Sequence, residues 1–132
     1  MLLFLAARQQ ERIATQTIAD AYGISLNHLL KVVRSLGELG YLELHRGAKG
    51  GVELAQDPHE ISVGAVMRAL DDRDALIECF QPDTDTCVIS PSCGLKSALR
   101  TAQEAFYASL DPLTIGALSK RRVSKLRELT GG

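Results

Sequence analysis

The order of apolar and polar residues over positions 1–40 predicts three helical segments. Residues 1–7 are almost entirely apolar and are typical of the end of a core helix, and residues 17–22 form a short helical stretch that Gly23 breaks. Residues 26–39 predict a longer helix, because Ser25 is a favoured N-cap and Gly40 follows its end. The apolar positions of this longer helix recur at helical intervals and form one buried stripe: Leu29, Val32, Val33, Leu36 and Leu39.

The opposite face of the longer helix is polar and carries Asn27, His28, Lys31, Arg34 and Ser35. Two helices joined by a glycine-containing turn, the second with a basic outer face, predict a helix-turn-helix whose second helix lies in the major groove of DNA. Asn27 and Arg34 are of the types that read adenine and guanine edges there. His28 is equally compatible with a solvent-facing residue that has no special role.

A hairpin follows this helix pair. Residues 41–45 and 52–55 predict two short strands around the glycine-rich turn 46–51. Arg46 and Lys49 supply positive charge for phosphate, and Gly50 permits close approach of the backbone. A plain surface hairpin explains the turn taken alone, but the order helix, helix, strand, turn, strand favours a DNA-binding wing. The candidate DNA-binding residues are Ser25, Asn27, His28, Lys31, Arg34, Arg46, Lys49 and Gly50.

The second half predicts a short helix, a loop and a long helix. Ser62 can cap a helix over residues 63–70, and Ser90 with Pro91 in the first turn starts a helix that continues to about residue 110. A winged helix is too small to cover the apolar stripe of the long helix, so we expect a twofold homodimer paired through it. Folding back over its own domain is the alternative. The stripe consists of Leu95, Leu99, Ala102, Phe106 and Leu110.

The predicted fold class is therefore mainly α with a small β-wing: a winged helix-turn-helix plus a long C-terminal dimerisation helix. We expect a DNA-binding domain over residues 1–56. Residues 57–132 would hold a linker helix, a cysteine loop (79–93), the dimerisation helix (91–110) and a C-terminal tail.

The loop contains every cysteine of the chain: Cys79, Cys87 and Cys93. No C-x-x-C pair is present, which argues against a zinc ribbon, whereas an iron-sulphur cluster accepts thiolates from a looser loop. Three thiolates leave one iron without a protein sulphur. A disulfide plus one free thiol and three buried cysteines that act as small hydrophobes are the other interpretations.

Composition and charge do not by themselves identify the function. The net charge of the 132 residues is −1, and residues 57–93, which include the loop, are strongly acidic, so a DNA-binding role depends on local geometry. Neither a secretion signal nor a membrane-spanning segment is visible, and we expect a cytoplasmic protein. The absence of a C-x-x-C pair, a phosphate-binding glycine fingerprint and a His/acid set argues against an enzyme.

Several motifs together carry a resemblance to a known family. They are Ile24-Ser25-x-Asn27-His28-Leu29-x-Lys31-Val32, then Arg46-Gly47-x-Lys49-Gly50-Gly51, then three cysteines before a long helix. This order resembles the bacterial Rrf2 family of iron-sulphur transcription regulators over nearly the whole chain, and most of all its NsrR-type nitric-oxide-sensing repressors. The resemblance implies a homodimeric repressor that binds a near-palindromic operator and holds a 2Fe-2S or 4Fe-4S cluster on Cys79, Cys87 and Cys93. Damage to the cluster by nitric oxide would release the DNA.

The chain departs from the family pattern in two places. The gap between Cys79 and Cys87 is longer than usual, and family members usually have further residues before the segment that begins here at Met1, so the start looks truncated. The resemblance implies that in some NsrR-type proteins an acidic residue near the N-terminus of the other subunit is the fourth ligand. In this chain the first acidic residue is Glu11. IscR-type members carry a ligating His where this chain has Lys96. An IscR-like regulator of iron-sulphur status and a metal-free thiol-based redox regulator therefore remain alternatives.

Overall fold

The computed structural model describes residues 1–9, 11–71, 80, 83, 85–120 and 128. Contacts divide the chain into two compact units, Met1–Ile61 with Leu113–Gly132, and Ser62–Pro112. The described residues are mostly helical, with one small two-stranded antiparallel sheet, and the predicted fold class is confirmed. In the part of the chain that the structure describes, no helix is long and apolar enough to cross a membrane.

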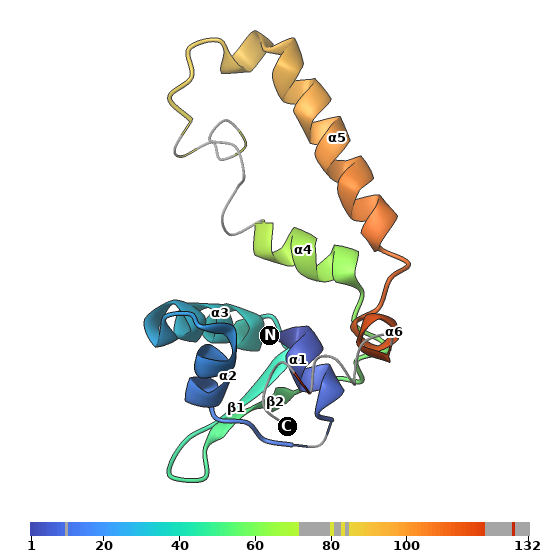
Figure 1. The fold of residues 1–132 in the computed structure, drawn as a ribbon. Helices are drawn as coiled ribbons and strands as arrows, with labels where there is room; N and C mark the ends of the chain where they lie inside the picture. Colours follow the sequence, from blue (N-terminus) through green and yellow to red (C-terminus); the bar gives the residue numbers. More distant parts are fainter. Residues whose placement is uncertain (10, 72–79, 81–82, 84, 121–127, 129–132) are drawn as a thin grey trace. The chain divides into compact units, whose positions relative to one another are not determined.

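The first unit contains four helices among its described residues (Figure 1): α1 (Leu2–Ala7), α2 (Thr15–Tyr22), α3 (Leu26–Glu38) and α6 (Ile115–Lys120). Its strands are β1 (Leu42–His45) and β2 (Gly51–Leu54). The largest fully buried side chains of its core are Phe4, Leu5, Ile18, Ile61 and Val52.

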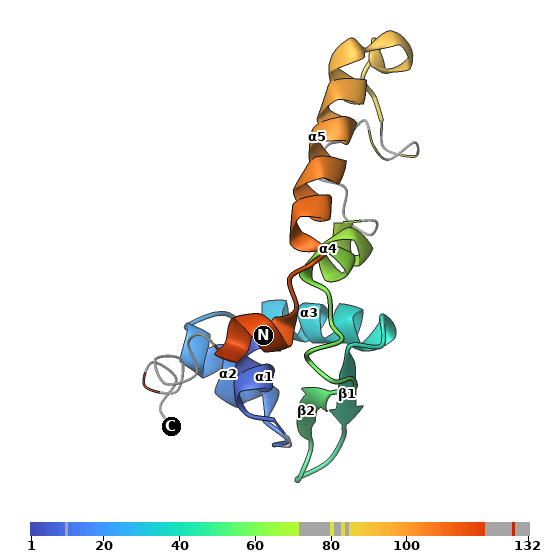
Figure 2. The same cartoon turned by 90° about the vertical axis from the view of Figure 1, so that its right-hand side faces the viewer.

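Helix α6 packs against α1 in this unit, as Figure 2 shows. The backbone N–H groups of Ile115 and Gly116 donate to the carbonyls of Ile61 and Pro58 at 3.0 and 2.7 Å. These bonds attach the start of α6 to the segment that leaves the wing. The sequence prediction treated the residues after 110 as a tail and did not find this helix.

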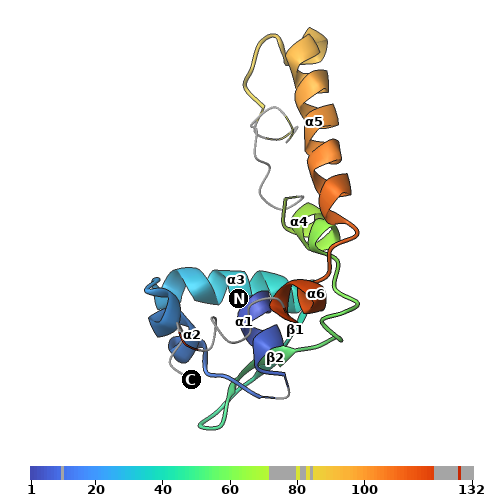
Figure 3. The ribbon, with the colours of Figure 1, turned by 45° about the vertical axis from the view of Figure 1, so that its right-hand side comes forward.

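Helix α3 runs as one continuous helix (Figure 3) and follows the predicted pattern closely. Leu29, Val33 and Leu36 are buried on one face. Ser25 occupies the N-cap position and its carbonyl accepts the N–H of Leu29 at 3.0 Å, but its side chain makes no capping bond. The hydroxyl of Ser25 is therefore exposed and not committed to the helix end.

The wing is an antiparallel ribbon that a third segment extends. Leu42 pairs with Leu54, Glu43 with Glu53, and His45 with Gly51. Ile13 forms an isolated bridge to Val52, with backbone bonds of 3.1 and 2.8 Å. Both backbone groups of Val52 therefore bond to Ile13, which attaches β2 to the segment that precedes α2.

The second unit consists, as far as described, of α4 (Val63–Asp71), a 3₁₀ turn η2 (Ser90–Ser92) and α5 (Gly94–Leu110). The Ser62 hydroxyl accepts the N–H of Ala65 at 3.3 Å, as expected of a cap, and donates to the carbonyl of Asp111 at 3.0 Å. A Cβ on Gly64 would lie 2.7 Å from the carbonyl oxygen of Tyr107, so only glycine permits this close packing of α4 on α5.

An ion-pair cluster also joins α4 to α5. The two terminal nitrogens of Arg68 contact Asp111 Oδ1 at 2.6 Å and Glu104 Oε2 at 3.4 Å, and its guanidinium lies 5.5 Å from the ring centroid of Tyr107. The hydrogen bond to Asp111 raises the pKa of Arg68 above its ordinary value. Arg68 therefore stays positively charged, as both of its ion pairs require.

The long helix starts later than predicted. Ser90, Pro91 and Ser92 form a 3₁₀ turn, Cys93 takes an extended conformation at the N-cap, and α5 begins at Gly94 rather than at Pro91. The turn closes through bonds such as Ser92 N–H to Ile89 O at 3.0 Å, which is compatible with a proline that has no N–H. The division into functional domains at residue 56 stays a prediction, although contacts return residues 113–132 to the first unit.

Candidate nucleic-acid interface and cysteine loop

The outer face of α3 presents the predicted DNA-reading side chains to solvent. Asn27, His28, Lys31 and Arg34 are all exposed, and so is Ser25 just before the helix. Asn27, Lys31 and Arg34 follow one another at intervals of four and three residues, so they share one face. The sequence-predicted residues of α3 therefore lie together on a surface that a groove of DNA can reach.

Arg34 has an ion-pair partner on its own helix. Its Nε donates to Glu38 Oε1 at 3.1 Å, one turn further along α3. The Arg34 side chain is 82% exposed, and an exposed i, i+4 pair is worth only about 0.3–0.5 kcal/mol. A base edge can therefore replace Glu38 as the partner of Arg34 at little cost.

The turn of the wing places Arg46 and Lys49 in solvent, and Gly50 has a structural reason of its own. A Cβ on Gly50 would lie 2.5 Å from the carbonyl oxygen of His45 and 2.8 Å from that of Gly47. The Gly50 N–H also donates to Gly47 O at 2.9 Å and closes the turn. Gly50 is thus required by the hairpin itself, independently of any approach to DNA.

A groove between α3 and the wing was not predicted. It has a volume of about 390 Å³, and its lining includes Leu30 of α3 together with Leu44 and the turn residues 46–48. Leu30 and Leu44 are 46% and 48% exposed. Apolar contact with a thymine methyl is one way in which DNA is read, so Leu30 belongs to the candidate interface. Its only sequence signal is an apolar residue beside the buried stripe of α3.

One face of the wing ribbon brings Glu43, His45 and Glu53 together, a cluster that the sequence interpretation also missed. Alternation along β1 places Glu43 and His45 on one face of the strand, and Glu53 lies opposite Glu43 on β2. The register that places Glu53 opposite Glu43 could be read only from the folded ribbon.

The cysteine loop is described from residue 85 onward, apart from the single positions 80 and 83. Cys87 is exposed and Cys93 is half-buried, both as free thiols, whereas Cys79 lies outside the described residues. Cys93 is the N-cap residue of α5, a position whose unpaired N–H groups favour negative charge. This location suits a thiolate.

A polar cluster organises the backbone between the two described cysteines. Asp85 Oδ1 accepts the N–H of Cys87 at 3.0 Å, Lys96 Nζ donates to Ser90 Oγ at 2.8 Å, and Lys96 Nζ lies 3.6 Å from Asp85 Oδ2. Hydrogen bonding, chiefly from Ser90 and then from the Cys87 N–H and Lys96, lowers the pKa of Asp85. Lys96 is therefore engaged with Asp85 and Ser90.

The donor set of this loop fits an iron-sulphur cluster better than a hard cation. Thiolates are the ligands that iron-sulphur clusters use, and Cys87 and Cys93 are both free to act as such. Val88 and Ile89, beside Cys87, are 94% and 62% exposed, so apolar surface is available to exclude water once it is covered.

Comparison with known proteins gives a consistent family match. The family model Rrf2, described as an iron-dependent transcriptional regulator, matches residues 1–121. The chain is 44% identical over 123 residues to the HTH-type transcriptional regulator NsrR of Bacillus subtilis strain 168, covering 92% of this chain and 84% of that relative. It is 45% identical over 130 residues to the NsrR of Geobacillus kaustophilus, covering 98% and 88%.

Solved structures show the same fold. CymR of Bacillus subtilis, titled the global cysteine regulator, superposes with a TM-score of 0.65 at 24% identity over 91% of this chain and 88% of that one. A structure titled T. potens IscR gives a TM-score of 0.63 at 23% identity over 91% of this chain and 79% of that one.

Proposed function

The chain is a member of the Rrf2 family of transcriptional regulators, and from that premise we propose that it is a homodimeric DNA-binding repressor of the bacterial cytoplasm. Its switch would be an iron-sulphur cluster, 2Fe-2S or 4Fe-4S, that reacts with nitric oxide. The observation that carries the proposal is the pairing of an exposed basic α3 face with a cysteine loop at the N-terminus of a long, largely exposed helix.

The DNA-reading part of the proposal rests on exposure and charge. Lys31 on α3 and Arg46 and Lys49 on the wing would bind phosphates, and Asn27 and Arg34 would read base edges in the major groove. His28 and Ser25 lie at the N-terminal end of α3, where a recognition helix contacts bases. Gly50 would hold the turn that presents Lys49.

The homodimer rests on the unburied face of α5. Tyr107 is the only residue of this seventeen-residue helix that is buried within the described chain. Leu95 and Phe106 are 65% and 53% exposed and belong to the stripe that recurs every three or four residues. A second copy of α5 would cover this stripe and bring two α3 helices to one near-palindromic operator.

The sensor part rests on the cysteines and on the family. Cys79, Cys87 and Cys93 would hold the cluster, and an iron without a protein thiolate supplies a position at which nitric oxide can bind. Asp85, Ser90 and Lys96 fix the backbone between Cys87 and Cys93. Because Cys93 is also the N-cap of α5, a change in how the loop is held acts directly on the start of the proposed dimer helix.

A metal-free thiol regulator is the second candidate, and one observation favours it. Cys87 is a free and exposed thiol, which is the accessibility that oxidant-sensing cysteines need. Analysis of iron and sulphide in anaerobically purified protein separates this candidate from the cluster protein.

An anaerobic spectrum tests the cluster. We expect visible charge-transfer absorption that nitric oxide bleaches, with operator binding lost in parallel. Cys93→Ala should abolish the absorption, whereas Ser92→Ala, a change in the adjacent exposed residue, should keep it. Colourless, iron-free protein that binds operator tightly and ignores nitric oxide would refute the cluster switch.

Alanine variants test the reading face separately. Lys31→Ala and Lys49→Ala should weaken binding to all sequences and reduce the salt dependence of binding by about one unit of slope each. Arg34→Ala should relax sequence preference by about 1–3 kcal/mol at one base pair. Unchanged affinity in all three variants, measured by gel shift on a palindromic operator, would reject the assigned faces.

A further inference from the structure

One face of the wing ribbon collects three potential metal ligands from two strands. Glu43 and His45 are two residues apart on β1, so their side chains leave the same face, and Glu53 on β2 pairs directly with Glu43. Like charges directly opposite each other destabilise an antiparallel pair. A ribbon that places two carboxylates opposite each other therefore gains from a cation between them.

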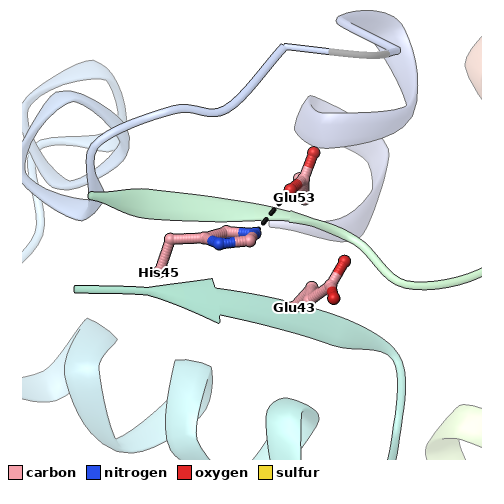
Figure 4. A group of neighbouring side chains, drawn as sticks. All are labelled: Glu43, His45 and Glu53. Atoms are coloured by element: carbon pink, nitrogen blue, oxygen red, sulfur yellow. Dashed lines mark ion pairs between the residues drawn. The ribbon is translucent and has the colours of Figure 1, made fainter. Parts of the chain in front are cut away.

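The imidazole of His45 completes the arrangement. Figure 4 shows the ring of His45 directed toward the carboxylate of Glu53, with the carboxylate of Glu43 on the same side of the ribbon. His45 Nε2 lies 2.5 Å from Glu53 Oε1, yet it is shielded from solvent and no hydrogen bond satisfies it. One ligand atom from each of the three residues lies within 4.8 Å of the others.

We propose that this cluster, Glu43, His45 and Glu53, is a divalent transition-metal site, with Zn²⁺ as its preferred occupant. The ligands would be His45 Nε2 and one oxygen from each carboxylate, with water in the fourth position. One nitrogen and two carboxylate oxygens suit Zn²⁺, which binds both kinds of atom at about 2.0–2.2 Å. Mg²⁺ and Ca²⁺ prefer sites built only of oxygens.

Arg12 is the competing cation. Its Nη2 lies 3.3 Å from the same Glu53 Oε1 that His45 approaches, and its side chain is 43% exposed. An exposed arginine–glutamate pair contributes little, so Zn²⁺ displaces it from that oxygen. Removal of the Arg12 charge should therefore strengthen metal binding, whereas removal of a ligand should weaken it.

Metal binding would have a consequence for the wing. A shared ion would link β1 to β2 just before the turn that carries Arg46 and Lys49, and it would offset the charge of two glutamates there. The wing would become stiffer and more positive. This consequence for DNA rests on the proposed function, whereas the metal site itself does not.

The test is calorimetric titration of the full chain with zinc chloride after alkylation of its cysteines, so that thiolates do not compete. We expect one site per chain. His45→Gln and Glu53→Gln should weaken it at least tenfold, because changes in groups that only orient a ligand already cost 10–100-fold. Arg12→Gln should tighten it about two- to fivefold. His28→Gln, which changes an exposed histidine of α3, is the matched control and should leave it unchanged.

Thermal unfolding without zinc checks that each variant is folded. Glu43 is exposed, so Glu43→Gln should leave the ribbon folded even where His45→Gln destabilises it. Glu43→Gln should also weaken zinc binding. Wild-type affinity in folded Glu43→Gln and His45→Gln would overturn the site. DNA binding is measured separately with and without zinc, so failure of the operator assay and failure of the metal site are distinguishable.

Discussion

The two contact units differ in how well each buries its own apolar residues. The first unit has a continuous core that includes Phe4, Leu5, Ile18 and Val52. Among the described residues of the second unit, only Val66 and Tyr107 are buried hydrophobic side chains. The same unit exposes Val88, Ile89, Leu95 and Phe106.

This difference follows from how much apolar helix surface each unit has to bury. The stripe of α3 is matched by α2 and by β1 of the wing within the same chain, whereas the stripe of α5 exceeds what a nine-residue α4 can cover. Burial of apolar surface is the main stabilising term in folding, and the described residues of the second unit leave apolar side chains exposed for a further contact to cover. A partner subunit and a cluster are the two completions proposed above.

The largest effect is expected from a charge in the unburied stripe. Phe106→Asp would place a carboxylate in the proposed dimer interface and should yield monomers in sedimentation equilibrium. Operator affinity should fall by about 100-fold or more, because two linked heads gain that much from effective concentration. Thr101→Asp, on another exposed face of α5, is the control. A Phe106→Asp protein that remains dimeric would remove α5 from the interface.

The second-largest effect is expected from the turn of the wing, which belongs to the first unit. Gly50→Ala would force a Cβ against the backbone carbonyls of His45 and Gly47, at a cost of about 1–3 kcal/mol in local strain. Urea unfolding should show that loss, and gel shifts should show about tenfold weaker DNA binding if the turn opens instead. Ala48→Ser, an exposed change in the same turn, should alter neither quantity. Wild-type behaviour of Gly50→Ala would contradict the turn geometry.

Substitution of one arginine in each unit compares how much their ion pairs contribute to stability. Arg68→Met removes bonds to Asp111 and Glu104 that join α4 to α5, and we expect a clear loss of unfolding free energy. Arg34→Met removes only an exposed pair within α3 and should cost less than about 0.5 kcal/mol. Equal losses in urea unfolding would mean that the Arg68 cluster does not hold the second unit together.

The smallest effect should come from the partner of Arg34. Glu38→Gln removes a negative charge from the DNA-facing side of α3 and leaves Arg34 without its ion pair. Operator affinity should rise about twofold, which corresponds to roughly 0.4 kcal/mol. Glu60→Gln, an exposed change outside the candidate interface, is the charge-matched control and should leave operator affinity unchanged. A weaker Glu38→Gln complex would indicate that Glu38 positions Arg34 for DNA.

Much of the fold was predictable because its patterns are local. The alternation of strands 42–45 and 51–54, the stripe of α3 and the cap at Ser62 each need only a few consecutive residues. The start of α5 was misplaced because Ser90 and Pro91 also suit a 3₁₀ turn. Helix α6 was missed because its six residues gain their stability from packing on α1, which no local pattern records.

The sequence alone determined the order of elements, the basic face of α3 and the three cysteines that mark the family, because these depend on residue type and spacing. Tertiary structure decided which distant residues meet. Strand register placed Glu53 opposite Glu43 and beside His45, and carbonyl positions made glycine necessary at position 50. Chain packing returned α6 to the first unit. Such contacts depend on pairing and burial across long separations, which spacing along the chain does not encode.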